Sequence, residues 1–134
     1  MKKKAIVFIT CALAIFLFAF VPATTEQKPW LIPDAAKNKP NPQKSEAASI
    51  ANGKTIYNLQ CKSCHGSKGK GDGPKAATLD TECGDLSKAS CQAQTDGSFF
   101  YKISEGRKDM PSFKKKITEG NDIWDVVNYL RTFK

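Results

Sequence analysis

The chain's single histidine directly follows two cysteines that are separated by two residues. The run reads Cys61-Lys62-Ser63-Cys64-His65. This is the attachment sequence of a c-type haem, in which each sulfur adds to one vinyl group and the imidazole binds the iron. One turn of backbone must present all three side chains to one macrocycle, so the motif strongly constrains the local fold. The sequence therefore predicts one covalent haem c, held by Cys61 and Cys64, with His65 as an axial ligand.

Two other kinds of site also use a Cys-x-x-Cys pair. One is a redox-active dithiol and the other is half of a zinc site. Zinc needs further ligands nearby, and a thioredoxin-like dithiol belongs to a fold with β-strands. The sequence shows no alternating β pattern. Covalent haem is therefore the better interpretation.

The N-terminus has the pattern of an export signal. Lysines at positions 2 to 4 precede an apolar run from Ala5 to Val21, and a small residue, Ala23, follows. We expect a cleaved signal peptide over residues 1–23. The alternative is an uncleaved membrane anchor through residues 5–21. Either one predicts a periplasmic or exported protein, the setting in which haem is attached covalently.

The remaining cysteines suggest a disulfide. Of the five cysteines, Cys11 lies in the apolar run, where it fits a lipoprotein site poorly and is better explained as an apolar filler. The haem motif uses two more, which leaves Cys83 and Cys91. Disulfides persist in oxidising compartments, so we predict a Cys83–Cys91 bridge. Two free thiols in a loop are the alternative.

The charge of the chain indicates protein partners. The sequence has 21 Lys and Arg against 13 Asp and Glu, and three of the lysines lie in the export segment. The modest positive charge that remains favours acidic protein surfaces or an anionic membrane. The basic residues are scattered, and no known nucleic-acid-recognition motif accompanies them, so we expect no nucleic-acid binding. The dense run Lys114 to Lys116 is either part of a docking surface or an ordinary solvated loop.

Proline and helical periodicity divide the exported part in two. Residues 24–45 carry four prolines and predict a proline-rich linker. Residues 46–134 predict one small domain. Its expected helices run from Glu46 to about Leu59 with Ser45 as N-cap, from Ser98 as N-cap through Ser104 to an end at Gly106, and from Asn121 or Asp122 to Phe133.

The other face of the iron needs a second ligand or stays open. Histidine is excluded because the only one is already used, and Met110 is the one methionine apart from Met1. Met110 lies in a loop bounded by Gly106 and Pro111, so it does not belong to the apolar stripe of a predicted helix. We predict His65 and Met110 as the two axial ligands. A methionine that fills a gap in the core, a lysine ligand and an open site are the alternatives.

Motif, order and spacing together resemble the class I monohaem c-type cytochromes over residues 46 to 134. The matching features are a helix before the motif, the glycine-rich loop that ends at Pro74, Met110-Pro111 and a terminal amphipathic helix. The resemblance implies an all-α cytochrome c fold, with three to five short helices wrapped around one haem. It implies that the first and last helices cross near Gly53 and Tyr129, and that the Pro74 carbonyl accepts the other ring N–H of His65. The insertion with the two further cysteines departs from the smallest members.

These features predict an electron-transfer protein and not an enzyme. Two permanent ligands leave no vacancy for a substrate, and Met/His ligation raises the reduction potential of the haem. The expected donor is a quinol-oxidising complex or a dehydrogenase, and the expected acceptor is a terminal oxidase or a reductase. We expect a monomer, free or membrane-tethered. The alternatives are an enzyme or gas sensor that opens its iron by releasing Met110, and a haem subunit docked permanently in a respiratory assembly.

Overall fold

A computed structural model describes residues 28–117 and 121–133 of the chain. The predicted signal peptide (residues 1–23) and anchor (residues 5–21) lie outside this part. The helices are α2 (Asp34–Lys37), α3 (Ala47–Gln60), α4 (Lys62–His65), α5 (Ala89–Gln92), α6 (Asp96–Glu105) and α7 (Asp122–Leu130), with a 3-10 helix at Ala76–Thr78. The described residues contain no strand, so the all-α class is confirmed. None of the described helices is long and apolar enough to span a membrane.

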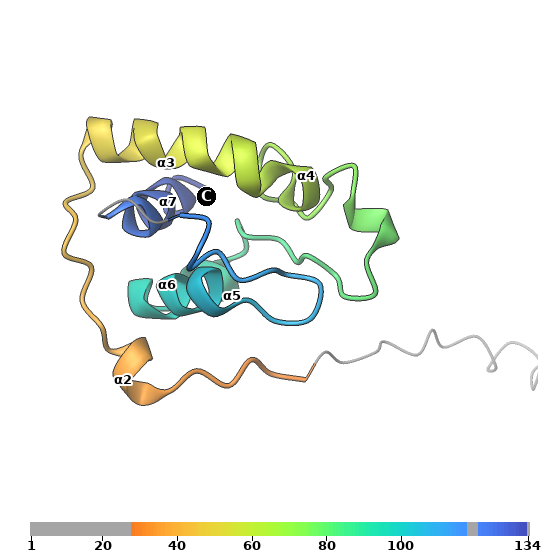
Figure 1. Cartoon of the computed structure of the whole chain (residues 1–134), viewed down its shortest axis with the longest axis horizontal. Coiled ribbons are helices and arrows are strands. Elements are labelled where there is room, and N and C mark those ends of the chain that lie inside the picture. The colour runs from red at the N-terminus through yellow and green to blue at the C-terminus, as the bar shows by residue number, and fades with distance from the viewer. Residues whose placement is uncertain (1–27, 118–120, 134) are drawn as a thin grey trace, which may run out of the picture. The chain divides into compact units, whose positions relative to one another are not determined.

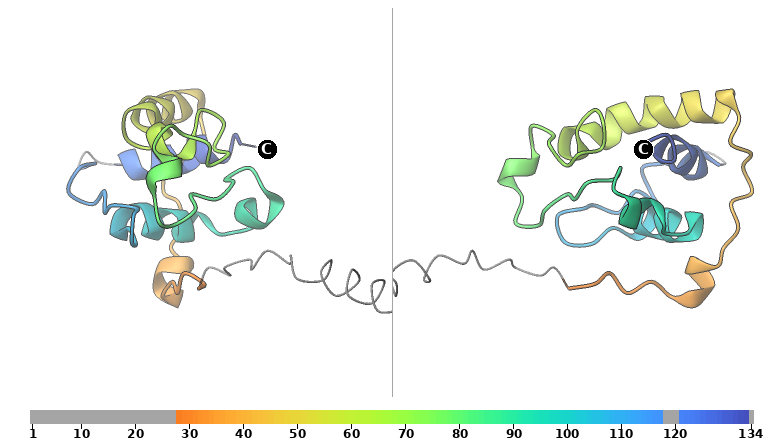
Figure 2. Two further views of the ribbon diagram at one scale, coloured as in Figure 1. Left: turned by 90° about the vertical axis from the view of Figure 1, so that its right-hand side faces the viewer. Right: turned by 180° about the vertical axis from the view of Figure 1, so that it is seen from behind.

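Helices α3 and α7 form the most extensive helix pair of the structure (Figures 1 and 2). Gly53 lies at their crossing, where a methyl group on its Cα would be 2.0 Å from the Asp125 carbonyl oxygen. Only a residue without a side chain lets the two backbones come this close. The expected small residue is therefore confirmed, but its partner is the backbone of Asp125 and Val126 rather than Tyr129. Tyr129 lies one turn later and packs against Tyr57, with ring centroids 5.3 Å apart.

The core is apolar and is built mainly from α7, α6 and the loop between them. Its fully buried members include Val126 and Val127. A buried polar cluster also joins α7 to α3, since the Ser49 hydroxyl donates to the Asp125 carboxylate at 2.6 Å and accepts from the Asn128 amide at 2.8 Å. The apolar core residues are Tyr57, Phe99, Ile103, Phe113, Ile117, Ile123, Trp124, Val126, Val127, Leu130 and Phe133.

Two of the predicted helix caps are wrong. Helix α3 has Glu46 at its N-cap position with no side-chain hydrogen bond, so Ser45 does not cap it. Helix α6 begins earlier than predicted, because the Thr95 side chain accepts the Ser98 N–H at 3.2 Å and takes the capping role. Ser98 is therefore a buried residue inside the first turn of α6. Its predicted end at Gly106 is confirmed.

Residues 31–45, here called the strap, do not behave as a free linker. The strap belongs to the same compact unit as helices α3 to α7, namely Leu31–Lys134. Its short helix α2 packs on α6, where the Thr95 hydroxyl donates to the Lys37 carbonyl at 2.6 Å. The Lys39 ammonium lies 4.3 Å from the centroid of the Phe100 ring, and the Asn41 amide donates to Asp96 at 3.0 Å. The prolines that break helical structure thus leave an extended segment that packs along the domain (Figure 1).

We predict that Gly53→Ala destabilises the folded protein. The added methyl group would overlap the Asp125 carbonyl, and overpacking of this kind costs about 2 kcal/mol. Urea unfolding of the haem-loaded protein measures the free energy of unfolding. The control is Asn58→Ala on the exposed face of α3, which should change that energy by less than about 0.5 kcal/mol. Equal unfolding midpoints for Gly53→Ala and the wild type would contradict the close crossing.

We also predict that Gly97→Ala releases the strap. A methyl group at Gly97 would lie 2.2 Å from the Ala36 carbonyl oxygen, so the strap must move away from α6. Cleavage by trypsin after Lys37 should become roughly tenfold faster, because the free energy of local opening sets the rate of proteolysis. Ser90→Ala, an exposed change in α5, should leave the rate as in the wild type. Unchanged cleavage in Gly97→Ala would mean that the strap is not held at this contact.

Candidate haem site

Helix α3 leads directly into the single turn that carries the haem motif. Cys61 ends α3 by donating its N–H to the Tyr57 carbonyl at 2.9 Å, and the same residue is the N-cap of α4. Its own carbonyl accepts the N–H groups of Cys64 at 3.2 Å and His65 at 3.0 Å. The structure therefore brings Cys61, Cys64 and His65 together on one turn, and all three are partly buried.

The loop that follows the motif folds back along α4. The Gly73 N–H donates to the Cys64 carbonyl at 3.1 Å, and the Lys75 N–H donates to the Ser63 carbonyl at 2.8 Å. Pro74 lies between these two anchors and is therefore held beside the motif turn. The hydrogen bond expected between Pro74 and the His65 ring is nevertheless absent, since His65 Nδ1 is buried and has no hydrogen-bond partner.

The protonation states of the motif suit metal ligation better than thiol chemistry. Burial lowers the pKa of His65, which favours the neutral imidazole that can bind a metal. Burial, with a smaller contribution from Cys64, raises the pKa of the Cys61 thiol to about 12. A redox-active dithiol needs the opposite shift, because its thiolate is the nucleophile. A zinc site finds no support either, since the part of the chain that the structure describes contains no cluster of three or more His, Cys, Asp or Glu that could hold a metal ion.

Met110 lies on a tight turn after α6. Backbone hydrogen bonds join Arg107 and Met110 in both directions, at 2.8 and 3.0 Å. The turn is tied back to α6, because the Ser112 hydroxyl donates to the Ser104 carbonyl at 2.6 Å and the Phe113 N–H donates to the Ile103 carbonyl at 3.1 Å. The Met110 side chain is partly buried and packs against the core.

Residues 79–88, here called the brace, connect the Met110 turn to the loop after the motif. At one end the Thr81 N–H donates to the Asp109 carboxylate at 2.8 Å. At the other end the Leu86 N–H donates to the Gly69 carbonyl at 2.7 Å, and Lys70 pairs with Asp85 at 3.2 Å. The brace therefore links the Met110 turn to the loop that directly follows the predicted ligand His65. Local sequence could not reveal the Thr81–Asp109 contact, because its partners are 28 positions apart.

The predicted disulfide is wrong, because Cys83 and Cys91 are both free in the structure. The two thiols lie among different charged and titratable neighbours, and this is the physical reason that they do not pair with each other. Burial raises the pKa of the Cys83 thiol, and the nearby Cys64 and Asp109 raise it further. The neighbours that act on Cys91 are Lys102, Arg131 and Asp85. Cys83 in the brace thus lies near both the haem motif and the Met110 turn, while Cys91 packs against the core.

The residues present fit a covalently bound haem. The two motif thiols are free, and the imidazole beside them has a buried Nδ1 without a hydrogen-bond partner. Buried polar atoms without a partner are rare in proteins, so the unpaired Nδ1 sets His65 apart from an ordinary packed histidine. Cys61 and Cys64 would supply the two thiols and His65 the nitrogen ligand, and Met110 is the one thioether among the described residues.

Comparison with known proteins agrees with this donor set. A search of curated proteins gave no significant match. Among solved structures, a chain of the reducing HAO-like protein complex of Kuenenia stuttgartiensis is 25% identical, with a TM-score of 0.62. The similarity covers 69% of this chain but only 46% of that one.

Residues 48–130 match the family described as cytochrome c oxidase, cbb3-type, subunit III. The matched region is more than half of the chain and includes the haem motif and Met110. This match and the all-α fold confirm the resemblance to c-type cytochromes. The chain therefore belongs to the cytochrome c oxidase cbb3-type subunit III family of c-type cytochrome domains.

Proposed function

We propose that this chain carries single electrons between exported redox proteins, through one haem c attached to Cys61 and Cys64 and ligated by His65 and Met110. The observation that carries the proposal is the motif turn, which presents two free thiols and a partly buried imidazole with a buried, unpaired Nδ1. When bound, haem c supplies a reversible one-electron couple whose potential depends on the axial ligands and their surroundings. The chain's own residues bind and orient the haem and limit its contact with water.

Three observations support Met110 as the second ligand. It is partly buried and packs against the core. Its turn is fixed by paired backbone hydrogen bonds. The brace also connects that turn, through Asp109, to the loop beside the haem motif. A thioether held in this way is available as a permanent ligand.

Pro74 has the proposed role of orienting His65. Its two neighbours, Gly73 and Lys75, donate to carbonyls of the motif turn, so the Pro74 carbonyl is kept close to that turn. The unpaired Nδ1 of His65 is the donor available for it once the other ring nitrogen binds a metal. This hydrogen bond would fix the ring orientation and raise the basicity of the ligand.

The same geometry favours electron transfer over substrate binding. A gas sensor or an enzyme would need Met110 to leave the iron. The paired turn and the Asp109 contact with the brace oppose such a movement. Iron with two permanent protein ligands has no open position, so one-electron exchange is the chemistry that remains.

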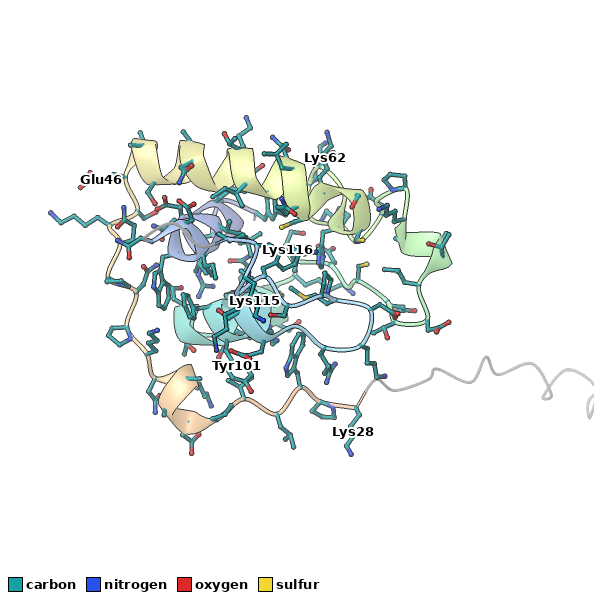
Figure 3. All side chains as sticks on the ribbon, in the orientation of Figure 1. Lys28, Glu46, Lys62, Tyr101, Lys115 and Lys116 are labelled. Atoms are coloured by element: carbon teal, nitrogen blue, oxygen red, sulfur yellow. The ribbon has the colours of Figure 1, made fainter. Side chains whose placement is uncertain are left out.

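Exposed lysines support partners with acidic surfaces. Lys62 lies on α4, and Lys115 and Lys116 lie on the loop before α7 (Figure 3). A basic surface steers association with acidic proteins. We propose a quinol-oxidising complex or a dehydrogenase as donor and a terminal oxidase or a reductase as acceptor. The protein would act in the periplasm or another exported compartment as a monomer, free or tethered.

A second candidate is a haem subunit fixed in a larger assembly. The structural neighbour from Kuenenia stuttgartiensis belongs to a protein complex, and that fact favours this alternative. A fixed subunit would stay in the membrane or complex fraction after a salt wash, whereas a diffusing carrier would be released.

We predict that Met110→Ala keeps the covalent haem but loses the absorption band of methionine–iron ligation and lowers the reduction potential. Removal of the thioether takes away a ligand that raises the potential. Spectra of the oxidised and reduced protein, together with a redox titration, measure both effects. Lys115→Ala, an exposed change farther along the same loop, should keep the band. Survival of the band in Met110→Ala would show that another residue binds the iron.

We also predict that Asp109→Ala loosens the Met110 turn, because it removes the acceptor of the Thr81 N–H. A hydrogen bond to a charged group contributes about 1.5 kcal/mol or more, so replacement of Met110 by an added ligand such as imidazole should become roughly tenfold more favourable. Asp109→Asn keeps an acceptor oxygen but loses the charge, so it should show a smaller increase than Asp109→Ala, whereas Asp80→Ala at an exposed position should behave like the wild type. Equal imidazole affinities for Asp109→Ala and Asp80→Ala would contradict a role for the brace.

A further inference from the structure

The carbonyl groups at the end of the haem-motif turn are all hydrogen-bonded. A helix leaves its last carbonyls without partners inside the helix, so other groups must satisfy them. Here residues 71 to 75 provide backbone N–H groups for three consecutive carbonyls. The pairs are Lys75 with Ser63 at 2.8 Å, Gly73 with Cys64 at 3.1 Å and Gly71 with His65 at 2.9 Å.

A side chain holds the next carbonyl in the series. The Tyr57 hydroxyl donates to the carbonyl of Gly66, the residue after His65, at 2.7 Å. The same carbonyl accepts only a longer bond from the Gly69 N–H, at 3.4 Å. The tyrosine is therefore the closer partner, and it fixes the carbonyl that ends the axial-ligand turn.

The Tyr57 ring has no freedom to place its hydroxyl elsewhere. Its side chain is fully buried, with 0% of its surface exposed. Tyr129 and Phe133 of the C-terminal segment pack edge-on against it, each with a centroid distance of 5.3 Å. Burial raises the pKa of Tyr57, so the hydroxyl stays protonated and remains a donor. The cluster therefore connects the α3–α7 core to the motif turn through one defined hydrogen bond.

We infer that Tyr57 is a positioning residue for the axial ligand His65. Its hydroxyl would hold the Gly66 carbonyl, and with it the backbone of the ligand turn, in the position that orients the imidazole toward the iron. This inference rests on the proposed function, because it concerns the haem ligated by His65. Loss of the hydroxyl would leave the partial negative charge of the buried Gly66 carbonyl poorly neutralised beside the ligand turn. Such a negative charge would stabilise the oxidised iron and so lower the reduction potential.

The test compares two haem-loaded variants, each of which loses one hydroxyl from the same aromatic cluster. Tyr57→Phe removes the donor to Gly66, whereas Tyr129→Phe removes the hydroxyl of the neighbouring, partly buried tyrosine. We expect Tyr57→Phe to have a lower reduction potential than the wild type and shifted paramagnetic NMR signals of the His65 ring. We expect Tyr129→Phe to change neither.

A purely structural role for Tyr57 would give a different result. Tyr57→Phe would then unfold at a lower urea concentration, but its potential and its His65 signals would match those of the wild type, and the inference would be overturned. Equal shifts in both variants would overturn it as well.

A measurement on the wild type covers the case in which Tyr57→Phe does not fold. A slowly exchanging Tyr57 hydroxyl proton close to Gly66 should be visible by NMR, and its absence would overturn the inference. A wild-type protein without haem would instead refute the proposed function. A loaded protein whose potential is indifferent to the Tyr57 hydroxyl would refute only the positioning role.

Discussion

The attachment of the motif turn to the rest of the protein is the constraint on which the site depends. Cys61, Cys64 and His65 occupy one turn, and such a short helix has too few internal hydrogen bonds to be stable alone. The backfolded loop of residues 66–75 and the Tyr57 hydroxyl supply the missing partners. The three side chains can therefore keep one orientation toward a shared ligand.

The remaining elements stabilise that turn from different sides. The close crossing at Gly53 fixes α3 on α7, and α3 leads through Cys61 into the motif turn. The brace reaches from the loop after the motif to Asp109, next to Met110. The strap contacts the rest of the domain through the packing of its helix α2 on α6. Core packing and ligand geometry are thus coupled through a few identified contacts.

Features that depend on local spacing were predictable from the sequence, and features that depend on distant partners were not. The motif turn, the long helix before it and the terminal amphipathic helix all follow from residue types at fixed intervals, whereas the crossing at Gly53 was implied by the resemblance to class I c-type cytochromes. The contacts of the strap could not be predicted from local sequence, because they depend on the missing side chain of Gly97 and on Asn41 contacts with Asp96 and Asn128, far along the chain. The Cys83–Cys91 prediction failed because oxidising conditions say nothing about which neighbours each thiol faces. Tyr57 carried one usable signal, since a tyrosine at a buried helical position usually needs a polar partner.

The central claim is that a haem is bound covalently at Cys61 and Cys64. Acid–organic extraction of the protein produced in an export-competent host, followed by intact mass measurement, tests it most directly. The account predicts that the colour stays with the polypeptide and that its mass exceeds that of the bare chain by one haem. If the colour passed entirely into the organic phase, or if the mass were that of the polypeptide alone, the claim would be contradicted.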